Sequence, residues 1–156
     1  QEHRYEDARP LWEDALAISR EEGADTLAVT QLAGLAGLEF HMGAQEDALR
    51  IALDALDQAC ELENVALRVW LLDFVAAFAV GSDPAAAVRI AAAAEAQRRA
   101  SGGGLTVQDL HITPAQEAAR GSLGRAVREA AWSEGRGLDL EDAVSAARSL
   151  RPVSVG

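Results

Sequence analysis

The stretch QEDALRIALDAL at residues 45–56 decides the fold of this chain. Its apolar side chains recur every three or four residues, which places them on one face of an α-helix. The opening motif EDAL at 46–49 repeats EDAR at 6–9, which lies 40 residues earlier. The overlapping ALRI at 48–51 recurs as AVRI at 87–90, 39 residues later. A motif at this spacing predicts a repeated unit of two helices.

Helix start and stop signals divide the whole chain into about seven or eight helices. Four residues are candidate N-caps, whose side chains accept a hydrogen bond from the first helical turn: Asp25, Asn64, Asp83 and Asp139. Glycines are expected to end helices, and Gly135 and Gly137 do so near the C-terminus. The expected helices span about 4–22, 26–42, 45–62, 65–80, 84–100, 113–120, 122–134 and 140–149.

These helices predict an all-α domain of stacked antiparallel hairpins, wound as a right-handed, tetratricopeptide-like solenoid. We expect one domain over 1–156, with hairpins at about 4–43, 45–80 and 84–120 and closing helices at 122–150. One hairpin cannot bury both of its apolar faces alone, so hairpins stack. Several small residues are expected to allow close helix contacts: Gly34, Ala36, Gly37 and Ala91 to Ala94. The alternative is an irregular helical bundle whose motif matches follow from alanine-rich composition.

Two of the expected helices have informative apolar patterns. The first carries a stripe that includes Leu11, Trp12 and Ile18, which we expect to face the core. The fourth, at 65–80, is apolar almost all round, and such a helix is normally buried between neighbours. We interpret all three tryptophans as packing residues: Trp12, Trp70 and Trp132.

The composition excludes several classes of partner. The formal net charge is −11, with 25 acidic residues against 14 arginines and no lysine. Such a surface repels nucleic-acid backbones and anionic lipids, so direct nucleic-acid binding and membrane binding are not expected. The chain shows no signal peptide and no transmembrane segment, which favours a cytoplasmic protein. Because it begins at Gln1 rather than Met, we expect a fragment of a longer multidomain protein.

The residue types that usually carry catalysis or bind metals are scattered along the chain. None of the three histidines has a second ligand at metal-binding spacing: His3, His41 and His111. Cys60 stands at the edge of an apolar helical stripe without an activating base, which favours a packing role. The run SGGG at 101–104 follows a helix and lacks the lysine of a phosphate-binding loop, which indicates a connector. We therefore expect no enzyme activity, no cofactor and no metal.

Two stretches resemble a known family. GSDPAAAVRI at 81–90, followed by AAEA at 93–96, resembles a Gly-Asp-Pro turn and the helix after it near the end of large actinobacterial regulators. AAWSEGRGLDLEDAV at 130–144 resembles their closing segment. These are the LuxR-type, SARP-like and cyclase-linked proteins, which join an ATPase switch module to a C-terminal tetratricopeptide-like region. The resemblance implies a sensor or scaffold arm of a transcription or signalling protein.

Three functions are in competition. The first is a non-catalytic module that binds a protein or peptide partner, including the ATPase module of its own chain. Its partner would contact the surface lined by the first helix of each hairpin, where we expect Arg50, Asp54 and Arg89. The second is a small-ligand sensor with the segment 102–112 as a flap. The third is self-association into a homodimer through apolar residues exposed on a terminal repeat.

Overall fold

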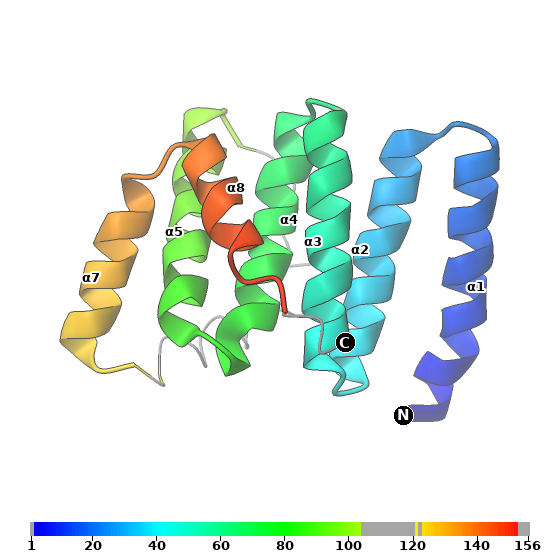
Figure 1. Cartoon of the computed structure of the whole chain (residues 1–156), viewed down its shortest axis with the longest axis horizontal. Helices are drawn as coiled ribbons and strands as arrows, with labels where there is room; N and C mark the ends of the chain where they lie inside the picture. The colour runs from blue at the N-terminus through cyan, green and yellow to red at the C-terminus, as the bar shows by residue number, and fades with distance from the viewer. Residues whose placement is uncertain (1, 104–120, 122, 153–156) are drawn as a thin grey trace.

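The computed structural model describes residues 2–103, 121 and 123–152, and this part of the chain is entirely helical, without a strand. Helices α1 to α5 stand side by side in one row, each antiparallel to the next (Figure 1). This arrangement confirms the predicted all-α array of stacked helical hairpins. The elements are α1 (Glu2–Glu21), α2 (Asp25–His41), α3 (Gln45–Glu61), α4 (Val65–Phe78), the 3-10 turn η1 (Ala79–Gly81), α5 (Pro84–Ala100), α7 (Arg125–Arg136) and α8 (Leu140–Arg148).

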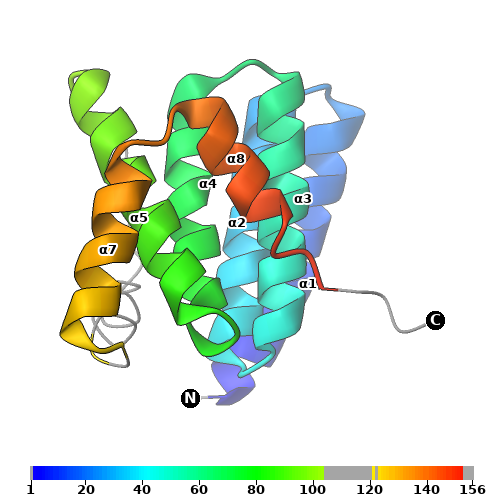
Figure 2. The ribbon, with the colours of Figure 1, turned by 60° about the vertical axis from the view of Figure 1, so that its left-hand side comes forward.

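The last two helices close the array in different ways. Helix α7 packs along α5 at the end of the row, as α2 packs along α1 at the other end. Helix α8 then turns back and crosses α5, α4 and α3 (Figure 2). The C-terminal residues 149–152 therefore return to the middle of the domain, beside α3 (Figure 1).

Three consecutive turns share one geometry. Gly23, Gly43 and Glu63 have positive φ angles of 68°, 85° and 53°. The residue after each donates its backbone N–H to the carbonyl oxygen five positions earlier: Ala24 to Ser19 at 2.8 Å, Ala44 to Glu39 at 2.9 Å and Asn64 to Ala59 at 3.2 Å. This is the Schellman pattern of helix termination. Because the turns recur every 20 residues, a hairpin takes 40, which is the period of the sequence motif.

The predicted helix starts are correct at three of four positions. The side chains of Asn64, Asp83 and Asp139 accept backbone hydrogen bonds of 2.8 to 3.0 Å from the third residue of α4, α5 and α8. The prediction was wrong for Asp25, because Ala24 is the N-cap of α2 and no side chain caps it. Asp25 lies in the first turn instead, where its charge still complements the helix dipole.

The core is continuous along the row, and α4 lies at its centre. As predicted, this helix is buried almost all round, and Phe74 and Val75 are fully buried. Phe74 meets Phe78 edge to face, with ring centroids 5.8 Å apart. Trp70 is half-buried and packs at right angles on Phe74, at 4.8 Å, which confirms its packing role.

The outer side of α1 differs from the expectation. Leu11 and Ile18 are 70% and 54% exposed, so they do not face the core. The buried side of α1 carries Leu16 and Ser19, and half-buried Trp12 packs against the same core. The apolar residues of α1 therefore form two stripes instead of the single stripe predicted. One faces the core and the other is exposed, because within the described domain α1 has a neighbouring helix on one side alone.

Gly135 has a different role from the one predicted. It does not end its helix, since α7 continues to Arg136, and Gly135 is buried. A methyl group at Gly135 would lie 2.0 Å from the carbonyl oxygen of Arg89, so the backbones of α5 and α7 meet at this point. Gly137 does occupy the C-cap position, as expected.

Two expectations fall on residues that the structure does not describe. These are the helix at 113–120 and nearly all of the flap at 102–112. The helix predicted from residue 122 is α7, which begins at Arg125. Among the described residues, no helix combines the length and the apolar character that crossing a membrane requires.

Candidate functional site

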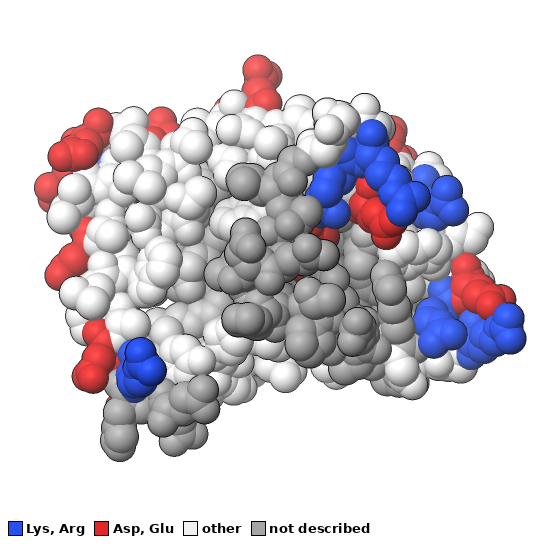
Figure 3. Space-filling model, turned by 180° about the vertical axis from the view of Figure 1, so that it is seen from behind, with Lys and Arg blue, Asp and Glu red and all other residues white. Residues whose placement is uncertain are grey.

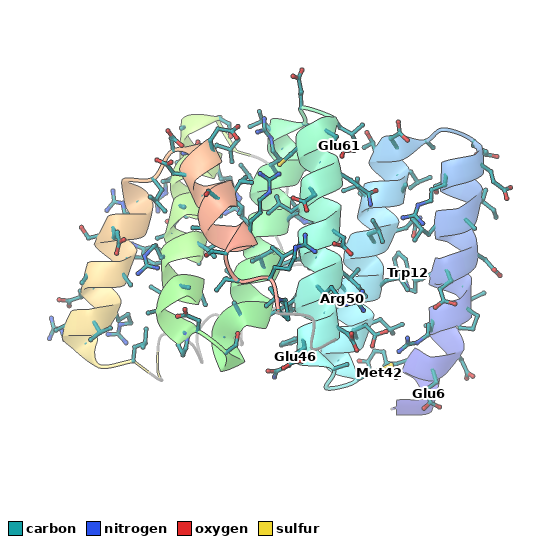
Figure 4. The ribbon with its side chains drawn as sticks, in the orientation of Figure 1. Glu6, Trp12, Met42, Glu46, Arg50 and Glu61 are labelled. Carbon is teal, nitrogen blue, oxygen red and sulfur yellow. The ribbon has the colours of Figure 1, made fainter. Side chains whose placement is uncertain are left out.

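The three residues predicted to contact a partner all hold ion pairs within the domain. Arg50 is exposed on α3 and bonds Asp47 one turn away, at 2.9 Å; this hydrogen bond raises the pKa of Arg50 (Figure 4). Asp54, also on α3, accepts a bond of 2.7 Å from Arg151. Arg89 lies on α5 and pairs with Glu134 of α7 at 3.1 Å.

The structure therefore does not gather these three side chains into one site. Arg89 ties α5 to α7, whereas Asp54 belongs to a cluster that fixes the C-terminal segment. In that cluster Asp57 accepts bonds from Arg148 at 2.8 Å and from Arg151 at 2.7 Å. A partner that used Asp54 would compete with the chain's own C-terminal residues, and the role of Arg50, Asp54 and Arg89 stays a prediction.

A groove of about 460 Å³ between α1 and α2 is a stronger candidate. Its lining comes from two consecutive helices and a third one further along the chain: Arg4, Tyr5, Ala8 and Trp12 of α1; Ala33, Gly34, Gly37, Leu38 and His41 of α2; and Phe74 of α4. Its volume is within the range of about 300–1,000 Å³ that is typical of small-molecule sites. Concave, mostly apolar and aromatic surfaces of this kind are the usual binding sites of helical proteins.

Trp12 forms the wall of the groove and reaches from α1 towards α2 (Figure 4). It can do so because Gly34 has no side chain: a methyl group there would lie 2.4 to 2.7 Å from three ring carbons of Trp12. The predicted close-contact role of Gly34 is therefore confirmed. The same contact fixes where the indole ring stands.

Gly37 lies one turn further along α2, and its surroundings are open. A methyl group at Gly37 would meet no heavy atom of the described residues within 4 Å, so the predicted close contact at this position was wrong. Glycine inside a helix costs about 0.5–1 kcal/mol relative to alanine. Within the described part of the chain no packing contact compensates for that cost, and what Gly37 contributes there is space in the groove.

The end of the groove near the N-terminus is polar and aromatic. The rings of Tyr5 and His41 stack with centroids 5.5 Å apart and planes 9° from parallel. His41 is the last residue of α2, the terminal position that the sequence favoured. Arg4, the residue before Tyr5, also lines the groove. Among the described residues that line the groove, none is acidic.

The neighbouring Arg9 has a structural role. Its guanidinium pairs with the carboxylate of Glu39 at 2.6 Å and contacts the sulfur of Met42 at 3.7 Å, which ties α1 to α2. The Glu39 side chain is 8% exposed and that of Arg9 is 38% exposed, so the carboxylate is largely removed from water while the guanidinium stays partly exposed.

The surroundings of the groove helices carry little charge on one side of the domain. Figure 3 views the domain from behind, with the α1 end at the left, and few charged side chains appear there except at the rim. For a chain with a net charge of −11, this is an uneven distribution. An uncharged surface beside an aromatic groove favours recognition of apolar groups.

The other residues considered as candidates for catalysis or binding lie in surroundings that indicate packing roles. Cys60 is half-buried against the core, and desolvation raises the pKa of its thiol, which disfavours the reactive thiolate. Trp132 packs with Val88 and Ala131, as expected of a packing residue. The described part of the chain holds no cluster of three or more residues suited to a metal.

The sequence could not have located this groove. Trp12, Gly37 and Phe74 lie on three helices, and no local motif links them. One signal was present: Gly34 and Gly37 are two glycines in the interior of a 17-residue helix, where each is unfavourable.

The chain was compared with known proteins. No family profile, curated protein or solved structure matches it.

Proposed function

We propose that this domain is a non-catalytic recognition module, the interaction or sensor arm of a bacterial transcriptional regulator or signalling ATPase, and that its binding site is the α1–α2 groove. The observation that carries the proposal is Gly37, a helix-interior glycine that leaves open space, among the described residues, in the groove that Trp12 and Tyr5 also line. The family resemblance of residues 81–96 and 130–144 supports the regulatory context.

The lining of the groove supports binding as its role in this proposal. Its walls are aromatic rings and aliphatic side chains, and the polar groups at one end are Arg4 and His41. A guanidinium is permanently charged and does not act as a general base. Such a set of groups can orient a ligand. A ligand bound in the groove can change how α1 packs against α2.

The experiment uses the chain as bait in a lysate of its source bacterium, beside a Gly37→Leu variant that fills the groove. The control is Thr26→Leu, which adds the same side chain to an exposed position on the same helix. Bound proteins are identified by mass spectrometry and small molecules by native mass spectrometry. A species held by the wild type and the control, but lost from Gly37→Leu, supports the proposal. If every retained species binds Gly37→Leu equally well, the groove is not the binding site.

Self-association is a second candidate, favoured by the exposed side chains of Leu11 and Ile18 on the outer side of α1. An exposed apolar pair at the end of a helical row can pair with a second copy. Sedimentation of the wild type and of Leu11→Gln/Ile18→Gln decides this: a dimer that the double variant abolishes supports self-association, and a monomer at high concentration contradicts it.

A further inference from the structure

We propose that the α1–α2 groove binds a small planar aromatic molecule that carries an anionic group, of the chemical class of an aromatic carboxylate. This inference rests on the proposed function, because it names the ligand of the same groove. It combines three observations: the open space at Gly37, the aromatic walls and the charge at one end.

The first observation fixes the size of the ligand. The groove has about 460 Å³ of space, and Gly37 leaves its floor open where any other residue would add atoms. Ala8 and Ala33 line it with single methyl groups. The space suits a molecule of one or two rings, whereas a long peptide would extend beyond it.

The second observation fixes its shape. The Trp12 ring is half-buried and held by its contact with the Gly34 backbone, whereas Phe74 also lines the groove but is fully buried and offers no surface to a ligand. Tyr5 and His41 are already stacked, which presents a second flat surface. Aromatic rings held in this way favour a planar ligand that stacks on them or meets them edge to face.

The third observation fixes its charge. Arg4 makes no ion pair with any residue that the structure describes, although the chain has many more carboxylates than arginines. Its neighbour Arg9, by contrast, is satisfied by Glu39. Arg4 therefore remains available for an anionic group, and His41 offers a ring N–H beside it. A carboxylate also meets no acidic group among the described lining residues, so nothing there repels it.

The test uses two probes of the same shape, 2-naphthoate and its neutral counterpart 2-naphthylmethanol. Both are titrated into the whole chain by calorimetry, and contact with the groove is checked by nuclear magnetic resonance signals of residues on α1 and α2. We expect 2-naphthoate to bind the wild type about fivefold or more tightly than the alcohol, since a charge-assisted contact adds about 1 kcal/mol or more.

Three variants locate the site. Gly37→Leu should abolish binding of both probes, and Thr26→Leu should leave both unchanged. Arg4→Gln should reduce the affinity for 2-naphthoate to that for the alcohol, without changing the affinity for the alcohol. Circular dichroism melts of each variant show that the fold is intact, because leucine is a good helix former at both positions on α2.

The outcomes separate this inference from the proposed function. Equal affinities for the two probes, or unchanged binding of 2-naphthoate by Arg4→Gln, overturn the anionic ligand. If neither probe binds but a protein from the lysate is lost with Gly37→Leu, the small-molecule inference fails and the proposed function stands. If neither probes nor lysate partners depend on Gly37, both fail.

Discussion

The backbone of Gly135 lies directly against the carbonyl oxygen of Arg89, where a methyl group would approach to 2.0 Å. Gly135→Ala should therefore force α7 away from α5 and lower the free energy of unfolding by about 1–3 kcal/mol, the usual effect of overpacking. Chemical denaturation measures this change. Gly137→Ala is the control, because its methyl group would lie 3.4 Å from the nearest atom, an ordinary contact. Equal stability of Gly135→Ala and wild type would contradict the close packing.

Gly34 and Gly37 lie one turn apart on α2 and should respond in opposite directions to alanine. Gly34→Ala collides with the Trp12 ring, so we expect a loss of about 1–3 kcal/mol in unfolding free energy. Gly37→Ala meets no atom and gains helix propensity, so we expect a gain of about 0.5–1 kcal/mol. Thermal and urea unfolding compare the two variants. Destabilisation by Gly37→Ala would show that this glycine is needed for packing.

Glu63 occupies a position that its two counterparts fill with glycine. Its φ of 53° lies in the left-handed region, which is unfavourable for a residue with a Cβ. Glu63→Gly should raise the free energy of unfolding by about 0.5–1 kcal/mol, while Gly43→Ala should lower it by a similar amount. Denaturation midpoints of the two variants test this pair. A loss of stability in Glu63→Gly would mean that the turn does not require this conformation.

Asp73 links the stability of the domain to pH. It is buried on α4 beside Arg98 of α5, and desolvation outweighs this pairing and raises the pKa of Asp73 to about 6. The folded state therefore holds a proton that the unfolded state has lost. The contribution of Asp73 to stability is fully present below about pH 4, and it falls as the pH rises through about 6.

The measurement compares wild type with Asp73→Asn from pH 4 to 7. We expect the unfolding free energy of the wild type to fall by on the order of 1–3 kcal/mol relative to Asp73→Asn over this range. Asp139→Asn is the control, because asparagine is an equivalent N-cap. If the difference between wild type and Asp73→Asn does not vary with pH, the assigned pKa is wrong.

Asp57 holds the C-terminal segment through two arginines. Asp57→Asn removes the ionic partner of Arg148 and one of the two ionic partners of Arg151, which keeps Asp54, so α8 should open more often. The pairs are partly exposed, so we expect a loss of up to about 1 kcal/mol, and less at high salt. Hydrogen exchange of α8 amides measures the opening. Asp47→Asn, which affects only the contact with Arg50 inside α3, should leave α8 protected.

Local signals in the sequence predicted the array well. Two kinds of signal act within one or two turns of chain, so their effect can be read directly: the N-caps Asn64, Asp83 and Asp139, and the glycines at 23 and 43. The 40-residue period of the motif then shows that the unit repeats. The prediction failed at Asp25 because the preceding Schellman turn starts α2 one residue earlier than a cap at Asp25 would. Ala24 therefore holds the N-cap position although it has no capping side chain.

The candidate site could not be read in the same way. Gly34, Gly37 and Gly135 look alike in the sequence, but their surroundings differ. Gly34 contacts the ring of Trp12, Gly37 faces open space among the described residues, and Gly135 contacts the backbone of another helix. Their roles depend on which residue a distant helix brings opposite. For the same reason, Leu11 and Ile18 matched an apolar period while lying on the side of α1 that has no neighbour within the described domain.

Because of the regular turns at residues 23, 43 and 63, the direction of the chain depends on whether an odd or an even number of helices has gone before. Each 20-residue step reverses the direction of the chain, so one added step would turn every later helix upside down relative to the helices before it. Two added steps would restore the direction. An array of this design can therefore grow or shrink in pairs of helices without rebuilding its closing segment, and duplication of residues 25–64 should yield a folded, longer domain whereas duplication of 25–44 should not.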